Sequence, residues 1–224
     1  MSVTNSELSL HKIERKEKQD GFTLLQAVTL VLLTFVVSVV GWYAAGKYFF
    51  WSDLDMQRVQ QQLEYLQKKV QAEPKNLENR VALGYTYYLK GENEKAVKEL
   101  NQVLEIDKNY YNAHYNLGLV YLDEGKLDDA LDEFQKCVEI SPRDHKGYLN
   151  KGITYRKMGM YKEALESLEK ANKLAPGSAN IIYEIGMVAE AKGDKKTAAG
   201  IYKEALSYDP LYKEAAEALK RVQK

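Results

Sequence analysis

The stretch NLGLVYLDEGKLDDALDEFQKCVEISP, residues 116–142, joins two amphipathic patterns through a glycine. Leu117 and Tyr121 lie four positions apart, which places both side chains on one face of a helix. Apolar side chains repeat this helical spacing after the glycine, with Phe134 among them. Gly125 separates the two patterns. A helix end at this place favours a left-handed backbone conformation, which only glycine adopts without strain. The stretch therefore predicts a helical hairpin.

The same pattern recurs with a period of 34 residues. A fixed period of this size predicts an array in which each unit packs on its neighbours. The columns are Gly84, Gly118, Gly152 and Gly186; Gly91, Gly125, Gly159 and Gly193; Ala96, Ala130, Ala164 and Ala198; and Pro142, Pro176 and Pro210, with Lys108 in the equivalent place. This register divides the region into four hairpins, at 77–110, 111–144, 145–178 and 179–212.

Small residues and proline occupy the positions at which close helix packing or the end of a helix requires them. Gly118 and Ala130 lack bulk, which lets the two helices of a hairpin approach closely. Pro142 ends the second helix because proline disfavours a helical conformation in the residue before it. The single cysteine, Cys137, lies in a column of small apolar residues, so we expect a buried packing residue rather than a nucleophile.

These residues resemble tetratricopeptide repeats, which share the period and the order of Leu-Gly, Tyr, Gly, Ala, Phe and Pro. The resemblance covers 77–212 and implies an all-α fold, an α-solenoid of paired helices. It also implies that partners bind in a groove lined by the first helix of each hairpin, at its second, fifth, sixth, ninth and twelfth positions. Those positions contain the candidate site residues Tyr85, Tyr88, Asn112, Tyr115, Asn116, Lys146, Asn150, Arg156, Asn180 and Tyr183.

Asparagine and tyrosine are suited to holding an extended segment of another protein. The asparagine amide both donates and accepts hydrogen bonds, so it can bind peptide backbone of any sequence. Tyrosine adds rigid contact area at low entropic cost. Some co-chaperones of this family clamp a C-terminal carboxylate, but here only Asn116 and Lys146 match the clamp. Val81, Tyr85 and Asn150 stand at its other positions, so we do not expect a clamp of that kind.

Residues 21–46 predict one transmembrane helix. The segment contains 23 uncharged residues from Thr23 to Ala45, which at about 1.5 Å each span the roughly 30 Å hydrocarbon core of a bilayer. Trp42 and Tyr43 begin an aromatic cluster typical of the headgroup region. The charged tail 1–20 contains more basic residues than the other flank, so we expect it in the cytoplasm. The repeats would then lie on the opposite side of the membrane from the cytoplasm. We expect this membrane to be that of a bacterial cell.

An alternative interpretation concerns the start of this segment. The residues from Gly21 to Leu25, GFTLL, resemble the junction at which a type IV prepilin is cleaved. Processing there would make the chain a structural component of a pilus or secretion assembly. Gln26 argues against it, because pilins usually place a glutamate there that pairs with a neighbour's terminal amine.

The segments on either side of the repeats are also expected to be helical. Residues 47–76 contain Leu66, which lies 34 positions before Leu100, so they predict a half-repeat helix packed on the first hairpin. Their apolar spacing also allows a short coiled coil and a weak homo-oligomer. The apolar residues concerned are Met56, Val59, Leu63, Leu66 and Val70. Residues 213–224 predict a capping helix, with Leu211, Ala215, Leu219 and Val222 on one face.

The sequence contains no recognised constellation for chemistry. We find no catalytic motif, no phosphate loop and no metal-ligand spacing among His11, His114 and His145, so we expect no enzyme, cofactor, metal or small-molecule substrate. A net charge of zero argues against nucleic acid. The layout is similar to bacterial envelope repeat proteins of the cytochrome c biogenesis type. It implies a membrane-anchored scaffold or chaperone-like adaptor that binds a partner protein during assembly of envelope complexes.

Overall fold

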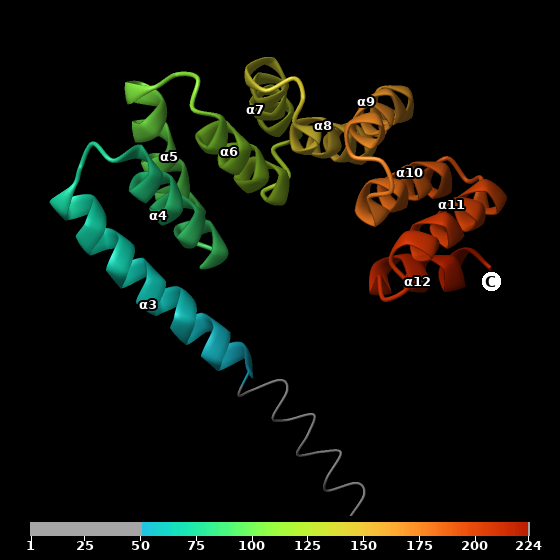
Figure 1. The fold of residues 1–224 in the computed structure, drawn as a ribbon, viewed down its shortest axis with the longest axis horizontal. Coiled ribbons are helices and arrows are strands. Elements are labelled where there is room, and N and C mark those ends of the chain that lie inside the picture. Colours follow the sequence, from blue (N-terminus) through green and yellow to red (C-terminus); the bar gives the residue numbers. More distant parts are fainter. Residues whose placement is uncertain (1–50, 224) are drawn as a thin grey trace, which may run out of the picture. The chain divides into compact units, whose positions relative to one another are not determined.

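A computed structural model describes residues 51–223, and all of this part is built from helices and short connections (Figure 1). Ten helices lie in it. They are α3 (Trp51–Ala72), α4 (Leu77–Leu89), α5 (Asn93–Ile106), α6 (Tyr111–Asp123), α7 (Leu127–Ile140), α8 (His145–Lys157), α9 (Tyr161–Leu174), α10 (Ala179–Ala191), α11 (Lys195–Tyr208) and α12 (Lys213–Val222). The expected segment 21–46 lies outside the described residues. Among residues 51–223, no helix has both the length and the apolar character of a membrane span.

The helices follow the 34-residue register of the sequence. The first helices α4, α6, α8 and α10 begin 34 residues apart, as do the second helices α5, α7, α9 and α11. Each first helix packs on the second helix of its own hairpin, and each second helix packs on the next hairpin. First helices also contact each other, α4 with α6 and α8 with α10. Identical helix boundaries in each repeat confirm the paired-helix solenoid expected from the periodicity.

Gly125 ends α6 as the sequence predicts. Its φ is 73°, in the left-handed region that favours glycine. The backbone N–H of Lys126 donates to the carbonyl of Tyr121 at 2.9 Å, and the N–H of Gly125 donates to that of Leu122 at 3.3 Å. These two bonds satisfy carbonyls that the helix end would otherwise leave without a partner. The turn to α7 is therefore specified locally.

The crossing of α6 and α7 requires the absence of a side chain at Gly118. A Cβ atom added there would lie 2.6 Å from Cε1 of Phe134. Phe134 and Ala130 are fully buried in this contact, and so is Cys137 one helical turn later. Burial raises the pKa of the Cys137 thiol to about 12, so it is a packing residue and a poor nucleophile.

Helix α3 contacts the first hairpin through its C-terminal part. Leu63 and Leu66 are buried in one cluster with Leu83 and Tyr87. The amide of Gln67 also donates to the Tyr87 hydroxyl at 3.0 Å. The apolar face that a coiled coil would offer to a second chain is therefore occupied by the first hairpin at these two leucines.

Helix α12 covers the last hairpin with Ala215, Ala218 and Val222, which are buried. The sequence prediction placed Leu211 on the same face, and this was wrong. Tyr212 caps the helix with an extended backbone, so Leu211 precedes the first turn and is 86% exposed.

Candidate functional site

A cavity of about 370 Å³ lies between α4 and α6, and we call it the α4–α6 cavity. Its lining comes from the second, fifth, sixth and ninth positions of both helices, together with Tyr110, which caps α6. The lining residues are Glu78, Val81, Ala82, Tyr85, Tyr110, Asn112, Tyr115, Asn116 and Leu119. Residues three and four apart share a helix face, and the contact between α4 and α6 brings the two faces together. Four of the ten predicted groove residues meet here: Tyr85, Asn112, Tyr115 and Asn116.

Tyr115 is held rigidly at the wall of the α4–α6 cavity. Its ring stacks on Tyr111 with centroids 6.0 Å apart and meets the edge of Phe134 at 6.2 Å. Its hydroxyl accepts a hydrogen bond of 3.2 Å from the amide of Asn150 on α8. Burial raises the pKa of Tyr115, so the phenol stays neutral at physiological pH. A fixed aromatic wall loses little entropy when a ligand binds.

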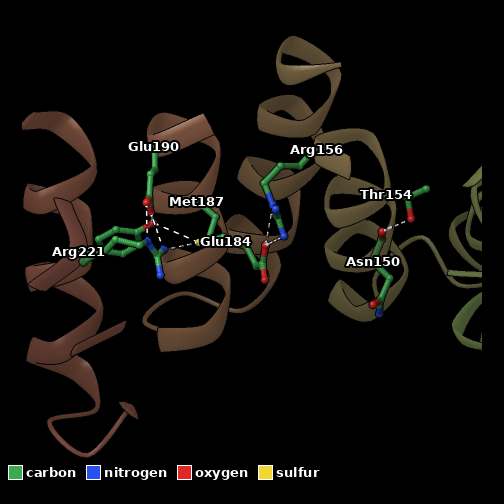
Figure 2. Close-up of polar contacts among 8 residues, drawn as sticks. Asn150, Thr154, Arg156, Glu184, Met187, Glu190 and Arg221 are labelled. Atoms are coloured by element: carbon green, nitrogen blue, oxygen red, sulfur yellow. Dashed lines mark hydrogen bonds and ion pairs between the residues drawn. The ribbon is translucent and has the colours of Figure 1, made fainter. Parts of the chain in front are cut away.

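Asn150 serves a different purpose from the cavity asparagines. Its side chain is buried, and its amide nitrogen donates both to Tyr115 and to the Lys146 carbonyl, the latter at 3.1 Å. The backbone carbonyl of Asn150 accepts a 2.7 Å hydrogen bond from the hydroxyl of Thr154 (Figure 2). Asn150 therefore positions Tyr115 and connects α8 to α6.

Asn112 and Asn116 keep their hydrogen-bonding capacity for a ligand. Asn112 is exposed and Asn116 is half-buried, and both line the cavity. Among the described residues, neither side chain makes a hydrogen bond within the chain. Each amide can thus donate to and accept from a peptide bond placed in the cavity.

The equivalent face of the C-terminal repeats contains an ion pair. On α8, Arg156 donates from Nε at 3.1 Å and from Nη2 at 2.9 Å to Oε2 of Glu184 on α10 (Figure 2). The two side chains are 17% and 15% exposed. Burial raises the pKa of Glu184, and Arg156 opposes that rise. Arg156, a predicted groove residue, therefore uses its charge within the protein.

A second ion pair fixes α12 to α10. Arg221 donates from Nε to Oε1 of Glu190 at 2.7 Å and from Nη2 to Oε2 at 2.8 Å (Figure 2). The hydroxyl of Tyr202 donates to the same carboxylate at 2.6 Å. These hydrogen bonds, led by those from Arg221, hold the pKa of Glu190 below its usual value. Carboxylate and guanidinium thus satisfy each other.

The remaining predicted groove residues lie elsewhere on the repeats. Tyr183 packs between Tyr202, at 5.7 Å, and Tyr212, at 5.3 Å. Asn180 lines another cavity, of about 330 Å³, with Tyr208 and Tyr212, and its oxygen accepts a 2.5 Å bond from Ser178.

Tyr88 and Lys146 are not part of the α4–α6 cavity either. Tyr88 is half-buried beside Tyr85, with 6.1 Å between the ring centroids. Lys146 is exposed on α8. Of the ten candidates, four therefore line the α4–α6 cavity, and Asn180 lines the cavity beside Tyr208 and Tyr212.

Sequence reasoning missed two polar members of the α4–α6 cavity, Glu78 and Tyr110. Glu78 occupies the second helix position, the same as Asn112 and Asn180, so the groove register contained the signal. Tyr110 immediately precedes α6 and falls outside the five groove positions. Only the packing of α6 against α4 reveals that it belongs to the lining.

A buried ion pair inside the second hairpin was also missed. His114 Nδ1 lies 2.5 Å from Glu133 Oε2, and His114 Nε2 lies 2.8 Å from the carbonyl oxygen of Lys108. Both neighbours only accept, so the two contacts together require the doubly protonated imidazolium. Burial disfavours that charge, but the bonds to Glu133 and Lys108 prevail and raise the pKa of His114. The pair joins α6, α7 and the loop between α5 and α6.

Comparison with known proteins identifies the repeats. A family model described as TPR repeat matches residues 84–123, and two described as tetratricopeptide repeat match 109–176 and 149–224. No curated protein matches the chain.

Solved structures with a similar fold include MamA, 27% identical, with a TM-score of 0.58 over 66% of this chain and 86% of that one. TTC0263, a thermophilic TPR protein of Thermus thermophilus, is 18% identical, with a TM-score of 0.65 over 77% and 94%. YrrB, described as a TPR protein with an unusual peptide-binding site, is 21% identical, with a TM-score of 0.60 over 74% and 86%.

Proposed function

Because the chain belongs to the tetratricopeptide repeat family, we propose that it is a non-enzymatic adaptor that binds an extended segment of a partner protein. The α4–α6 cavity supports this most directly, because its amides have no partner within the described chain while its aromatic wall is rigid. A cavity of about 370 Å³ suits one or two side chains and the backbone between them. The peptide-binding site attributed to YrrB agrees with such a use of this fold.

In the proposed mode of binding, the groove continues from the α4–α6 cavity along the first helices of the later repeats. Asn180 and Lys146 are exposed there and contribute polar contacts at the second helix position. Tyr88 and Tyr183 contribute apolar area. Asn150 and Arg156 shape the groove through their bonds to Tyr115 and Glu184 instead of binding the segment themselves.

The proposal includes a membrane anchor formed by residues 21–46, with residues 1–20 in the cytoplasm. The support is the uncharged run in the sequence and the basic residues before it. Residues 47–76 connect the anchor to the repeats, and 213–224 end them. Anchoring keeps the cavity near the membrane, which suits assembly of envelope complexes.

Crosslinking in the native membrane tests the binding site. A photoreactive residue at Tyr85, in the cavity, should produce a crosslinked product that the same residue at Tyr65, exposed on α3, does not. The double variant Asn112→Ala/Asn116→Ala should reduce that product several-fold. Equal products at both positions, or a product insensitive to the asparagines, would rule out the cavity as the binding site.

The mass and N-terminal sequence of the membrane-extracted chain test the anchor. A chain that begins near Met1 supports a permanent anchor. A chain that begins at Phe22 supports the alternative, a pilin-like component processed after Gly21.

A further inference from the structure

We propose that the α4–α6 cavity selects a basic side chain, lysine or arginine, within the extended segment that it binds. This inference rests on the proposed function and specifies the chemistry of the partner. It follows from the charge of the lining, from the aromatic rings around it and from its electrostatic surroundings.

The lining of the α4–α6 cavity contains one charged residue, and that residue is acidic. Glu78 is exposed in the first turn of α4, and no lysine or arginine is among the lining residues. Lys146 occupies the equivalent position of α8 but does not line the cavity. A basic side chain entering here meets a carboxylate and no repelling cation, whereas an acidic side chain meets repulsion.

Three tyrosines in the lining suit the same occupant. Tyr85, Tyr110 and Tyr115 contribute aromatic rings, whose negative faces attract a cation. Tyr85 is 40% exposed, so a ligand can reach it. Tyr115 is held by stacking and by the bond from Asn150. Arginine gains most from such a site, because its flat guanidinium can stack on a ring and donate to Glu78 together.

The charged groups that raise the pKa of Tyr110 and Tyr115 are carboxylates. Burial raises the pKa of Tyr110, and Glu78 and Asp107 raise it further. Burial likewise raises the pKa of Tyr115, and Asp144 adds to the rise. A position that disfavours a tyrosinate through neighbouring negative charge favours a cation, so the surroundings reinforce the preference set by Glu78.

The amides of Asn112 and Asn116 complete the recognition. They can bond to the peptide backbone on both sides of the basic residue without reading its neighbours. The backbone contacts therefore provide affinity for an extended chain, and Glu78 with the rings provides the choice of side chain. This division predicts that charge alters selectivity more than it alters the capacity to bind.

The test uses the purified full-length chain and short dye-labelled peptides in which valine alternates with arginine, citrulline or glutamate. Citrulline keeps the shape of arginine and removes its charge. Fluorescence anisotropy at low salt should give a Kd about three- to tenfold lower for the arginine peptide than for the citrulline peptide. The glutamate peptide should bind most weakly, and added salt should narrow the differences.

Two matched variants assign the preference to the cavity. Glu78→Gln should reduce the difference between arginine and citrulline peptides to less than about twofold. Glu94→Gln is the control, because Glu94 is also the second residue of its helix, is exposed, and does not line the cavity. It should leave the preference unchanged. An arginine preference that survives Glu78→Gln would overturn the proposal.

The other outcomes separate this inference from the proposed function. If arginine and citrulline peptides bind equally and Asn112→Ala/Asn116→Ala weakens both, the selectivity is refuted and peptide binding stands. If no peptide binds while the crosslink at Tyr85 remains, the selectivity for a basic side chain is refuted, and binding of a partner protein at the cavity stands. Loss of both the peptide binding and that crosslink overturns the two proposals together.

Discussion

The first two repeats and the last two use the same helix register but place their charged pairs on different sides of the hairpins. In the first two, one pair in each hairpin joins its two helices: Arg80 with Glu99 at 2.6 Å, and His114 with Glu133. The α4–α6 cavity between these hairpins contains no ion pair. In the last two repeats, the positions equivalent to His114 and Glu133 include Ile182 and Ile201, which join one apolar cluster.

In the last two repeats, the ion pairs that join helices lie instead between successive first helices, with α12 following α10 in this series. Arg156 and Glu184 connect α8 to α10, and Glu190 and Arg221 connect α10 to α12 (Figure 2). By the 34-residue period, Arg156 and Glu184 correspond to Tyr88 and Asn116 of the first two repeats, and Glu190 and Arg221 correspond to Tyr88 and Leu119. The positions that line the α4–α6 cavity at Asn116 and Leu119 therefore form internal connections in the other half. The side chains decide which, because the helix boundaries are the same.

Removing the shared apolar core should have the largest effect. Phe134→Ala removes a fully buried ring that packs against Gly118 and Tyr115, and it should lower the free energy of unfolding by about 3–5 kcal/mol. Hydrogen exchange should show lost protection in α6 and α7 and smaller changes in α10 to α12, because each repeat contacts only its neighbours. Uniform loss along residues 51–223 would mean that the two halves unfold as one unit.

Breaking an ion pair of the C-terminal half should have the next largest effect. Arg156→Met leaves the mostly buried Glu184 carboxylate without its partner and should cost about 3 kcal/mol. The double variant Arg156→Met/Glu184→Leu should recover most of this loss, because an apolar pair avoids desolvation of charge. Denaturant unfolding measures both. Equal losses in the single and double variants would show that the pair contributes packing and no specific charge interaction.

The stability of the first two repeats should depend on pH through His114. A folded-state pKa raised above the ordinary 6.5 stabilises the fold fully below that value, and the contribution is lost as pH rises through the folded pKa. The loss is bounded by a charge-assisted hydrogen bond, about 1.5–3 kcal/mol.

Hydrogen exchange in α6 and α7 monitors unfolding at neutral and at alkaline pH and so measures this dependence. The His114→Gln variant should be less stable at neutral pH, and its stability should lack this dependence on pH. Glu133 sets the opposite limit, because its pKa is lowered by His114 and Lys136, against the effect of burial, and its contribution is lost as pH falls. An unchanged pH profile in the variant would contradict the assignment.

The smallest effects should distinguish two asparagines at the same repeat position. Asn150→Ala removes the bonds to Tyr115 and the Lys146 carbonyl and should cost about 1–2 kcal/mol. Asn116→Ala removes no bond within the described chain and should change the free energy of unfolding by less than about 0.5 kcal/mol. Thermal melts of the two variants compare them directly. Equal costs would mean that the open and the internally bonded amide do not differ.

Much of the fold could be predicted because its signals are local. Gly125 must adopt a positive φ, and the clash of a Cβ atom at Gly118 with Phe134 involves residues of one hairpin. The candidate site was predicted only in part. Tyr85, Asn112, Tyr115 and Asn116 do share a cavity, whereas the groove register gave no sign that Asn150 and Arg156 are bonded within the protein.

The sequence by itself determined the period, the helices of the repeats and the places where they turn, because backbone bonds, glycine conformation and helix faces depend on neighbours a few positions away. The tertiary structure alone decided which groove positions stay open. Asn150 meets Tyr115 across 35 positions, and Arg156 meets Glu184 across 28. No local pattern separates these residues from Asn116 and Glu78, because the outcome depends on the side chain that the adjacent hairpin presents.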